Sequence, residues 1–194
     1  MLDSTESARR ERWNERYRLM ADEAQSPAEL LTENLHLLPA QGRALELACG
    51  LGANALFLAR AGLDVLAVDY ALPAVERLHA RARAEGLSVI AECADLTAWT
   101  PEEAAFDLIV VAHYLHRPLA PLIERALAPG GRLFYQTFTN EREQGPSNPL
   151  HLLVPGELAQ LFPGLQTVLY REEGPLAAPG NRRRGLAQLI ARRP

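Results

Sequence analysis

The residues of this sequence best suited to chemistry are two glycines and one acidic side chain. Gly50 and Gly52 lie in the segment CGLG, and Asp69 follows about twenty residues later. A glycine has no Cβ, so backbone can pass close to a ligand, and the helix expected after the turn presents unpaired amide groups. A carboxylate at the end of the next strand can accept hydrogen bonds from both hydroxyls of a ribose. The pattern therefore predicts a cofactor that contains a nucleoside.

The glycine turn alone leaves the kind of cofactor open. Residues 50–55 also fit the G-x-G-x-x-G/A pattern of dinucleotide-binding proteins, with Asp69 at a compatible distance. An oxidoreductase that binds NAD is therefore one interpretation of this stretch. A tight turn that binds no ligand is another, but the acidic end of the second strand argues against it.

The elements around these residues form a βαβ unit. Residues 44–48 are a short apolar run, a helical pattern extends to Arg60, and residues 65–68 are a second apolar run that ends at Asp69. The two strands are expected to be parallel, because a helix-length crossover joins them.

The rest of the chain continues the alternation of strands and helices. Helices are expected over residues 8–20, from Pro27 to near Pro39, and over 73–84, 118–128 and 155–161. Strands are expected over residues 88–93, 106–112, 132–138, 165–171 and 185–191, with the segment 129–131 as a sharp turn. The polar segment 139–148 is a candidate substrate loop. The Pro- and Gly-containing connection between the last two strands shows no helix-length pattern, which allows them to be antiparallel neighbours.

Composition excludes several classes of protein. The chain has 194 residues and a net charge of −4, and its basic residues are all arginines. No apolar run approaches the length of about 20 residues that spans a bilayer, and the charged N-terminus does not resemble a signal peptide. Cys49 and Cys93 are the only cysteines, so we expect neither a disulfide framework nor a zinc site. Residues 182–184 are a short arginine cluster without interleaved aromatics, which is weak evidence for nucleic-acid binding. We expect a cytoplasmic protein with no membrane or nucleic-acid partner.

Several motifs in order resemble those of class I S-adenosylmethionine-dependent methyltransferases, over about residues 10–192. They are ELACGLG at 46–52, the strand end VD at 68–69, ADL at 94–96, FDLI at 106–109 and LAPGG at 127–131. Together with the alternating pattern, the resemblance implies a doubly wound, Rossmann-like α/β sheet of seven strands in the order 3-2-1-4-5-7-6, mostly parallel, with the last strand antiparallel. We expect a single domain, 1–194, with a helical cap over 1–38 and the Rossmann-like core over 43–192.

The resemblance also implies a site for S-adenosylmethionine. Asp69 would hold the ribose hydroxyls, and Asp95 would face the adenine amino group beside the amide of Leu96. The other expected contacts are with the methionine part, the ribose and their surroundings: Glu46, Ala48, Gly50, Gly52, Asn54, Tyr70, Ala112 and His113. Ala48 stands where glycine is frequent in this motif.

Residues 13–17 read WNERY, which resembles a W-x-x-R-Y helix of small methyltransferases similar to those of tellurite resistance and of thiopurines. Trp13 and Tyr17 are four residues apart and share a helix face. The resemblance implies a lid that closes over the cofactor, whereas packing of two aromatics at the edge of the core is the simpler alternative.

The chemistry follows from the cofactor, whose sulfonium makes its methyl carbon electrophilic. The protein must align a nucleophile with the departing sulfur and exclude water. The candidate catalytic residues are His113, Tyr114 and His116, which follow the fourth strand, although each also suits a packing role. We expect a small-molecule methyl acceptor and a monomer or homodimer. A non-catalytic S-adenosylmethionine-binding regulator has the same motifs, whereas a base-modifying nucleic-acid methyltransferase is disfavoured because the strand ends in HYLH rather than N/D-P-P-Y/F.

Overall fold

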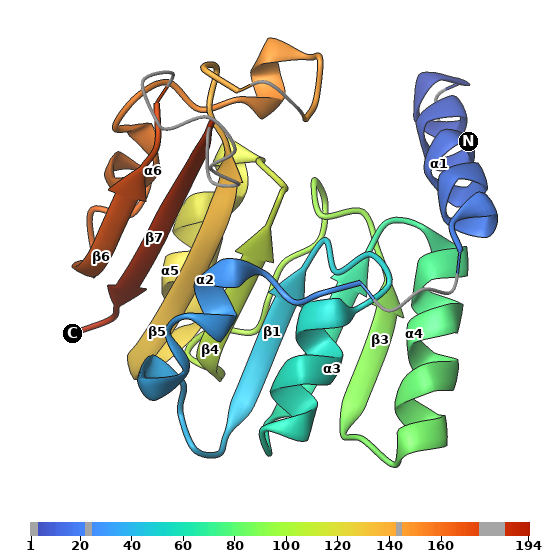
Figure 1. Ribbon diagram of the computed structural model, residues 1–194, viewed down its shortest axis with the longest axis horizontal. Coiled ribbons are helices and arrows are strands. Elements are labelled where there is room, and N and C mark those ends of the chain that lie inside the picture. The colour runs from blue at the N-terminus through green and yellow to red at the C-terminus, as the bar shows by residue number, and fades with distance from the viewer. Residues whose placement is uncertain (1–3, 22–24, 143–144, 175–184) are drawn as a thin grey trace.

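The computed structural model describes residues 4–21, 25–142, 145–174 and 185–194, and its centre is a seven-stranded sheet in the order β3-β2-β1-β4-β5-β7-β6 (Figure 1). The strands are β1 (Arg43–Leu47), β2 (Asp64–Asp69), β3 (Val89–Cys93), β4 (Phe106–Ala112), β5 (Leu127–Phe138), β6 (Gln166–Glu172) and β7 (Leu186–Arg192). β1 to β5 pair in parallel, and β7 is antiparallel to both β5 and β6. The predicted fold class and strand order are confirmed.

Helices cover both faces of this sheet. The α-helices are α1 (Ser4–Leu19), α2 (Glu29–Thr32), α3 (Ala53–Arg60), α4 (Leu72–Glu85), α5 (Ala120–Ala126) and α6 (Glu157–Gln160), and short 3-10 helices occupy η1 (Leu35–Leu37), η2 (Arg117–Leu119) and η3 (Pro149–His151). α2, α3 and α4 lie on one face and α5 and α6 on the other, while α1 stands above the end of α4 (Figure 1).

The core consists of two apolar layers, one on each face of the sheet. Ala44 in β1 packs with Leu30 and Leu58 on the α2–α4 face. Leu45 and Leu47 pack with the residues of α5 and α6 on the other face. Successive side chains of a strand point to opposite faces, so a continuous apolar run is what a sheet covered on both sides requires.

The helix predicted from Pro27 to near Pro39 is shorter than expected. Only Glu29–Thr32 is α-helical, and Leu35–Leu37 is a separate 3-10 turn. The side-chain amide of Asn34 donates to the Leu30 carbonyl over 2.9 Å. The helix ends there because a side chain takes the carbonyl that the next turn of backbone would need.

β5 is longer than predicted, because it begins at Leu127 rather than at Arg132. The segment 129–131 is therefore not a turn before the strand but an interruption inside it, and the pairing with β4 shifts register between Phe106 and Leu108. A Cβ on Gly131 would lie 2.8 Å from the Ala128 carbonyl oxygen and 2.9 Å from that of Phe106. The close approach of two backbone segments makes glycine necessary at this position.

Some predictions from the sequence fall on residues outside the described ranges, and others are not tested by the structure. The arginine cluster 182–184 and residues 143–144 of the polar loop lie outside the described residues. Within the described ranges, no helix is long and apolar enough to cross a bilayer, and no cluster of His, Cys, Asp and Glu suits a metal ion. The division into a cap and a core stays a prediction.

Candidate active site

The glycine turn between β1 and α3 is built from three residues in the left-handed backbone region. Ala48 has a φ of 56°, Gly50 of 53° and Gly52 of 76°. The Cys49 amide donates to the Val68 carbonyl over 3.1 Å, which ties the turn to the end of β2. A left-handed residue with a Cβ costs about 1–2 kcal/mol, so this backbone explains why glycine is frequent at position 48 in the motif.

Asp69 orders this turn from the end of β2. Its Oδ2 accepts from the Gly50 amide over 2.7 Å, and its Oδ1 accepts from the Ala71 amide over 2.9 Å. Burial raises the pKa of Asp69, although the amide hydrogen bonds oppose this shift. A carboxylate has about four acceptor positions, so these two bonds leave capacity for the ribose hydroxyls.

The two glycines of the turn have different neighbours. A Cβ on Gly50 would lie 2.8 Å from the hydroxyl oxygen of Tyr17, so α1 comes down directly on the turn. A Cβ on Gly52 would lie 2.2 Å from Cδ1 of Leu78 in α4. Gly50 therefore allows the Tyr17 side chain of α1 to come close to the turn, whereas Gly52 allows α4 to pack.

α1 is attached above the turn by a small apolar cluster and by polar bonds. Trp13 and Tyr17 stack with ring centroids 6.0 Å apart, and both pack against Leu51, Ala71 and Ala74. Arg77 of α4 donates to the Tyr17 carbonyl over 2.7 Å. Two aromatic rings thus lie over the glycine turn, and burial raises the pKa of the Tyr17 hydroxyl.

Glu46 is a buried carboxyl group on β1. Only 2% of the residue is exposed, and its Oε1 accepts from the Asn54 side chain over 2.8 Å. The Asn54 Oδ1 accepts from the Ala28 amide over 2.8 Å, which links α3 to the segment before α2. The Glu46 Oε2 is buried and has no hydrogen-bond partner among the described residues. Burial raises the pKa of Glu46 to about 8, despite bonds from Asn54 and the Ala55 amide.

The loop after β3 forms the other end of the predicted site. Asp95 accepts from the Thr97 amide over 2.9 Å and from Arg9 of α1 over 2.9 Å. Glu6, Arg9, Asp95, Thr97 and Ala98 line a cavity of about 370 Å³ between α1 and this loop. Burial tends to raise the pKa of Asp95, but the bonds from Thr97 and the charge of Arg9 outweigh it and lower the pKa.

Neighbours of Asp95 differ in what they can offer to a ligand. The Leu96 side chain is buried, so only its backbone is available for a contact with adenine. The Tyr70 ring lies under the guanidinium carbons of Arg9 and Arg10, at 4.9 Å and 4.7 Å from the ring centroid. The Tyr70 hydroxyl donates to the Glu6 carbonyl over 3.1 Å, so Tyr70 fastens α1 to the end of β2.

Comparisons with known proteins agree with this geometry. A family model described as "Methyltransferase domain" matches residues 44–131. Trans-aconitate 2-methyltransferase of Variovorax paradoxus is 33% identical over 150 residues, which are 73% of this chain and 54% of that protein. Protein-L-isoaspartate O-methyltransferase of Methylorubrum extorquens is 36% identical over 104 residues, or 54% of this chain and 45% of that protein.

A solved structure is similar over nearly the whole chain. The TehB-like S-adenosylmethionine-dependent methyltransferase of Corynebacterium glutamicum has a TM-score of 0.69 and 20% identity, with 97% of this chain and 100% of that chain covered. At 20% identity this structural similarity shows the fold alone. The chain spans about half the length of the two curated relatives. The chain belongs to the class I S-adenosylmethionine-dependent methyltransferase family. The family implies S-adenosylmethionine as the cofactor.

The site of this methyltransferase family member suits that cofactor. The Glu46 Oε2 is a buried, unpartnered carboxyl oxygen, and a nearby cationic methionine amino group would favour the ionised form of Glu46 that accepts a hydrogen bond. The turn and Asp69 suit the ribose, and the cavity at Asp95 suits the adenine. The individual contacts predicted for these residues stay predictions.

His113 and Tyr114 lie at the carboxyl end of β4. His113 has a φ of 59°, is exposed, and packs on Phe138 with ring centroids 5.1 Å apart. Tyr114 is half-buried, and burial is the main cause that raises its pKa to about 12. The Tyr114 carbonyl accepts a hydrogen bond from the Tyr135 hydroxyl over 2.9 Å. With that pKa, Tyr114 keeps its proton at neutral pH and suits a donor role better than that of a base.

His116 lies in a different environment from His113, which packs on Phe138. It lines a second, smaller cavity of about 100 Å³ together with Trp99, Pro118 and Leu122. Burial lowers the pKa of His116, which favours the neutral ring. The predicted catalytic residues therefore do not form one cluster, since His113 faces β5 and His116 faces the loop after β3.

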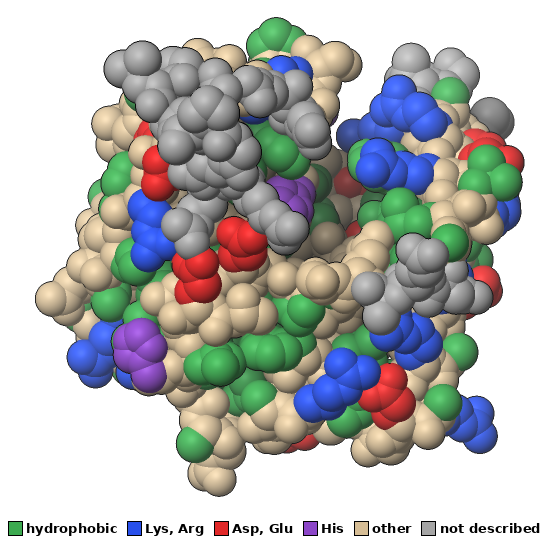
Figure 2. All heavy atoms as spheres, in the orientation of Figure 1, with side chains coloured by type: hydrophobic (Ala, Val, Ile, Leu, Met, Phe, Trp, Pro, Cys, Tyr) green, Lys and Arg blue, Asp and Glu red, His purple; other side chains and the backbone are tan. Residues whose placement is uncertain are grey.

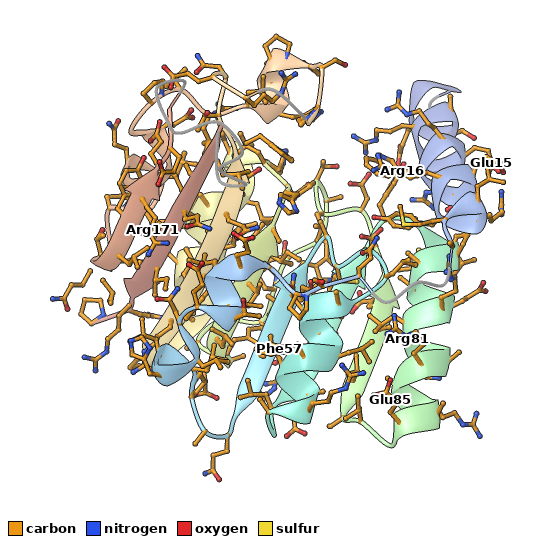
Figure 3. The ribbon with its side chains drawn as sticks, viewed as in Figure 1. Glu15, Arg16, Phe57, Arg81, Glu85 and Arg171 are labelled. Carbon is orange, nitrogen blue, oxygen red and sulfur yellow. The ribbon has the colours of Figure 1, made fainter. Side chains whose placement is uncertain are left out.

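The surface is hollowed between α1 and the loops at the carboxyl ends of β4 and β5, with arginines on the α1 side and a histidine on the opposite wall (Figure 2). Arg16 lies on the side of α1 that faces this hollow, and Glu15 lies on the outer side (Figure 3). The Arg16 guanidinium carbon is 5.0 Å from the centroid of the Trp13 ring, and among the described residues it has no carboxylate partner. The polar partners of the site, Arg9 and Gln136, were not predicted from the sequence. The local signal for Gln136 was a polar residue directly after the apolar run 133–135.

Proposed function

We propose that this chain transfers a methyl group from S-adenosylmethionine to a small-molecule acceptor by in-line displacement. The observation that best supports this is the cover of aromatic side chains over the ordered glycine turn. Tyr17 lies above Gly50, whose amide Asp69 holds, and Trp13 stacks on Tyr17. Aromatic faces near a sulfonium add cation–π attraction of about 0.5–2 kcal/mol and exclude competing water. This arrangement suits the reaction better than simple storage of the cofactor.

We propose that the acceptor carries a carboxylate. The two curated relatives are named for trans-aconitate and for isoaspartate, which both contain carboxyl groups. Arg16 is exposed on the inner side of α1 and has no ion-pair partner among the described residues, so it is available to an anion. A carboxylate is ionised at neutral pH, so its methylation needs no general base.

The proposal is tested by screening small acceptors with methyl-labelled S-adenosylmethionine. We expect label in a base-labile ester when di- or tricarboxylic acids are supplied, and no label from nucleic acid. Arg16→Gln should raise KM for such an acceptor several-fold and change kcat little. Arg18→Gln is the matched control, because Arg18 already pairs with Glu11 over 2.6 Å. Tight binding of NAD, or transfer to a nucleic acid, would contradict the proposed function.

A further inference from the structure

A chain of two buried side-chain amides leads from β7 through the neighbouring strand β5 to His113. Gln188 in β7 and Gln136 in β5 are direct partners in the register of the sheet, and they are 1% and 4% exposed. The Gln188 Nε2 donates to the Gln136 Oε1 over 3.3 Å, and the Gln136 Nε2 is 3.2 Å from the His113 Nε2. The His113 backbone amide also donates to the Gln136 carbonyl over 2.9 Å, so Gln136 holds the residue at two points.

The direction of this chain determines where His113 carries its proton. When Gln188 donates to the Gln136 oxygen, the Gln136 NH2 group must point to His113. The His113 Nε2 is then the acceptor, and a neutral ring has its proton on Nδ1. The reverse direction needs both amides turned and leaves the Gln188 NH2 buried without an acceptor. The present direction leaves only the Gln188 Oε1 without a partner, and an unpaired oxygen is more common in proteins than an unpaired N–H.

We propose that the Gln188–Gln136 pair is a positioning device that holds His113 as the Nδ1–H tautomer with its Nε2 occupied. His113 then serves the bound ligand as a hydrogen-bond donor and not as a general base. Among the described residues the Nδ1 has no partner, and the residue is exposed. Although the residue is exposed overall, neighbouring atoms desolvate its ring, which lowers the pKa of His113 and favours the neutral ring. The left-handed backbone of His113 agrees with a position held for function, since such strain persists only where the surroundings impose it.

The tautomer of His113 does not depend on the proposed function. Only the identity of the ligand that accepts the hydrogen bond from His113 rests on the proposed function. A donor at this place suits an acceptor or cofactor oxygen, and a carboxylate acceptor does not need a base. The tautomer itself is a property of the free protein. Its measurement therefore separates a failure of this inference from a failure of the proposed methyl transfer.

Nitrogen-15 NMR of the ring nitrogens, with labelled histidine in the full chain at neutral pH, tests the proposal. His113→Gln identifies the His113 signals among those of the five histidines. We expect the wild-type protein to show a neutral ring with a protonated Nδ1 and a bare Nε2. A protonated Nε2, or a charged ring, would overturn the proposal.

Gln136→Glu tests the role of the amide with almost no change in volume. A carboxylate at this place can only accept, so we expect the His113 proton to move to Nε2 and its pKa to rise by about one unit or more. Gln41→Glu is the control, because Gln41 is exposed in the loop before β1 and should leave the ring unchanged. An unaltered tautomer in a folded Gln136→Glu protein would show that Gln136 only packs. If that variant does not fold, the wild-type spectrum still shows which ring nitrogen of His113 carries the proton. Gln188→Met removes the donor to the Gln136 Oε1 and should therefore give a mixture of the two tautomers.

Discussion

Replacement of the buried Glu46 by glutamine should remove a pH dependence of stability. The carboxyl group is 2% exposed, and burial raises its pKa from 4.5 to about 8. The folded state therefore holds a proton that the unfolded state releases at lower pH. As pH rises from the unfolded value through the folded value, the free energy of unfolding of the wild-type protein decreases, and Glu46→Gln should lack this decrease.

The size of the effect follows from the difference between the two pKa values. Each unit of difference corresponds to about 1.4 kcal/mol. Between about pH 5.5 and pH 8 the contribution of Glu46 to the free energy of unfolding should fall by about 3 kcal/mol. Glutamine keeps the acceptor for Asn54, whose bond to Oε1 is 2.8 Å long, so the packing stays similar.

Urea unfolding of the wild-type protein and of Glu46→Gln at both pH values measures this difference. Other titrating groups cancel when the two proteins are compared at the same pH. Glu102→Gln is the control, because the Glu102 side chain is 68% exposed and should change the pH dependence little. If Glu46→Gln gains no stability relative to the wild-type protein as pH rises, Glu46 is ionised in the fold and the assignment of an unpartnered Oε2 is wrong.

Three further predictions concern the cofactor, the turn and α1. Asp69→Ala should weaken S-adenosylmethionine binding at least about tenfold in calorimetry, because the ribose loses charged hydrogen bonds of about 1.5–3 kcal/mol each; wild-type affinity would contradict this role. Gly52→Ala should destabilise the protein by about 1–3 kcal/mol more than Gly86→Ala in urea unfolding, because both positions have a positive φ but only Gly52 faces a side chain, that of Leu78. Removal of residues 1–20 should abolish methyl transfer and reduce cofactor binding less, with circular dichroism showing an intact sheet; full turnover would mean that α1 only packs.

The alternation of apolar runs and helical patterns predicted the strands of the sheet, and the resemblance to class I methyltransferases added their order. Residues 106–112 form a continuous apolar run, which is what a central strand covered on both faces must be, and β4 is that strand. The Pro- and Gly-containing connection before residue 185 has no helical pattern in its sequence, which allowed an antiparallel last strand, because a parallel strand needs a helix-length crossover; β7 is antiparallel to both of its neighbours. The glycine turn and the acid that ends β2 were predicted for the same reason, since both depend on residues close together in sequence.

Element boundaries depended on contacts that local patterns do not contain. α2 ends where the Asn34 side chain takes the Leu30 carbonyl. β5 extends back to Leu127 because Gly131 allows backbone from β4 to come close. Helical periodicity carries neither kind of information, because each depends on one side chain or on a strand distant in sequence.

The partners of the site residues were decided only by the tertiary structure. The glycines of the turn look alike in sequence, yet Tyr17 lies over Gly50 and Leu78 fills the space beside Gly52. His113 was predicted as a candidate base from its place after β4, but its ring environment depends on Gln136 and on Gln188, 52 residues further along the chain. A sequence specifies which residue types stand at the end of each strand. Which side chains meet there depends on how strands and helices distant in sequence pack together.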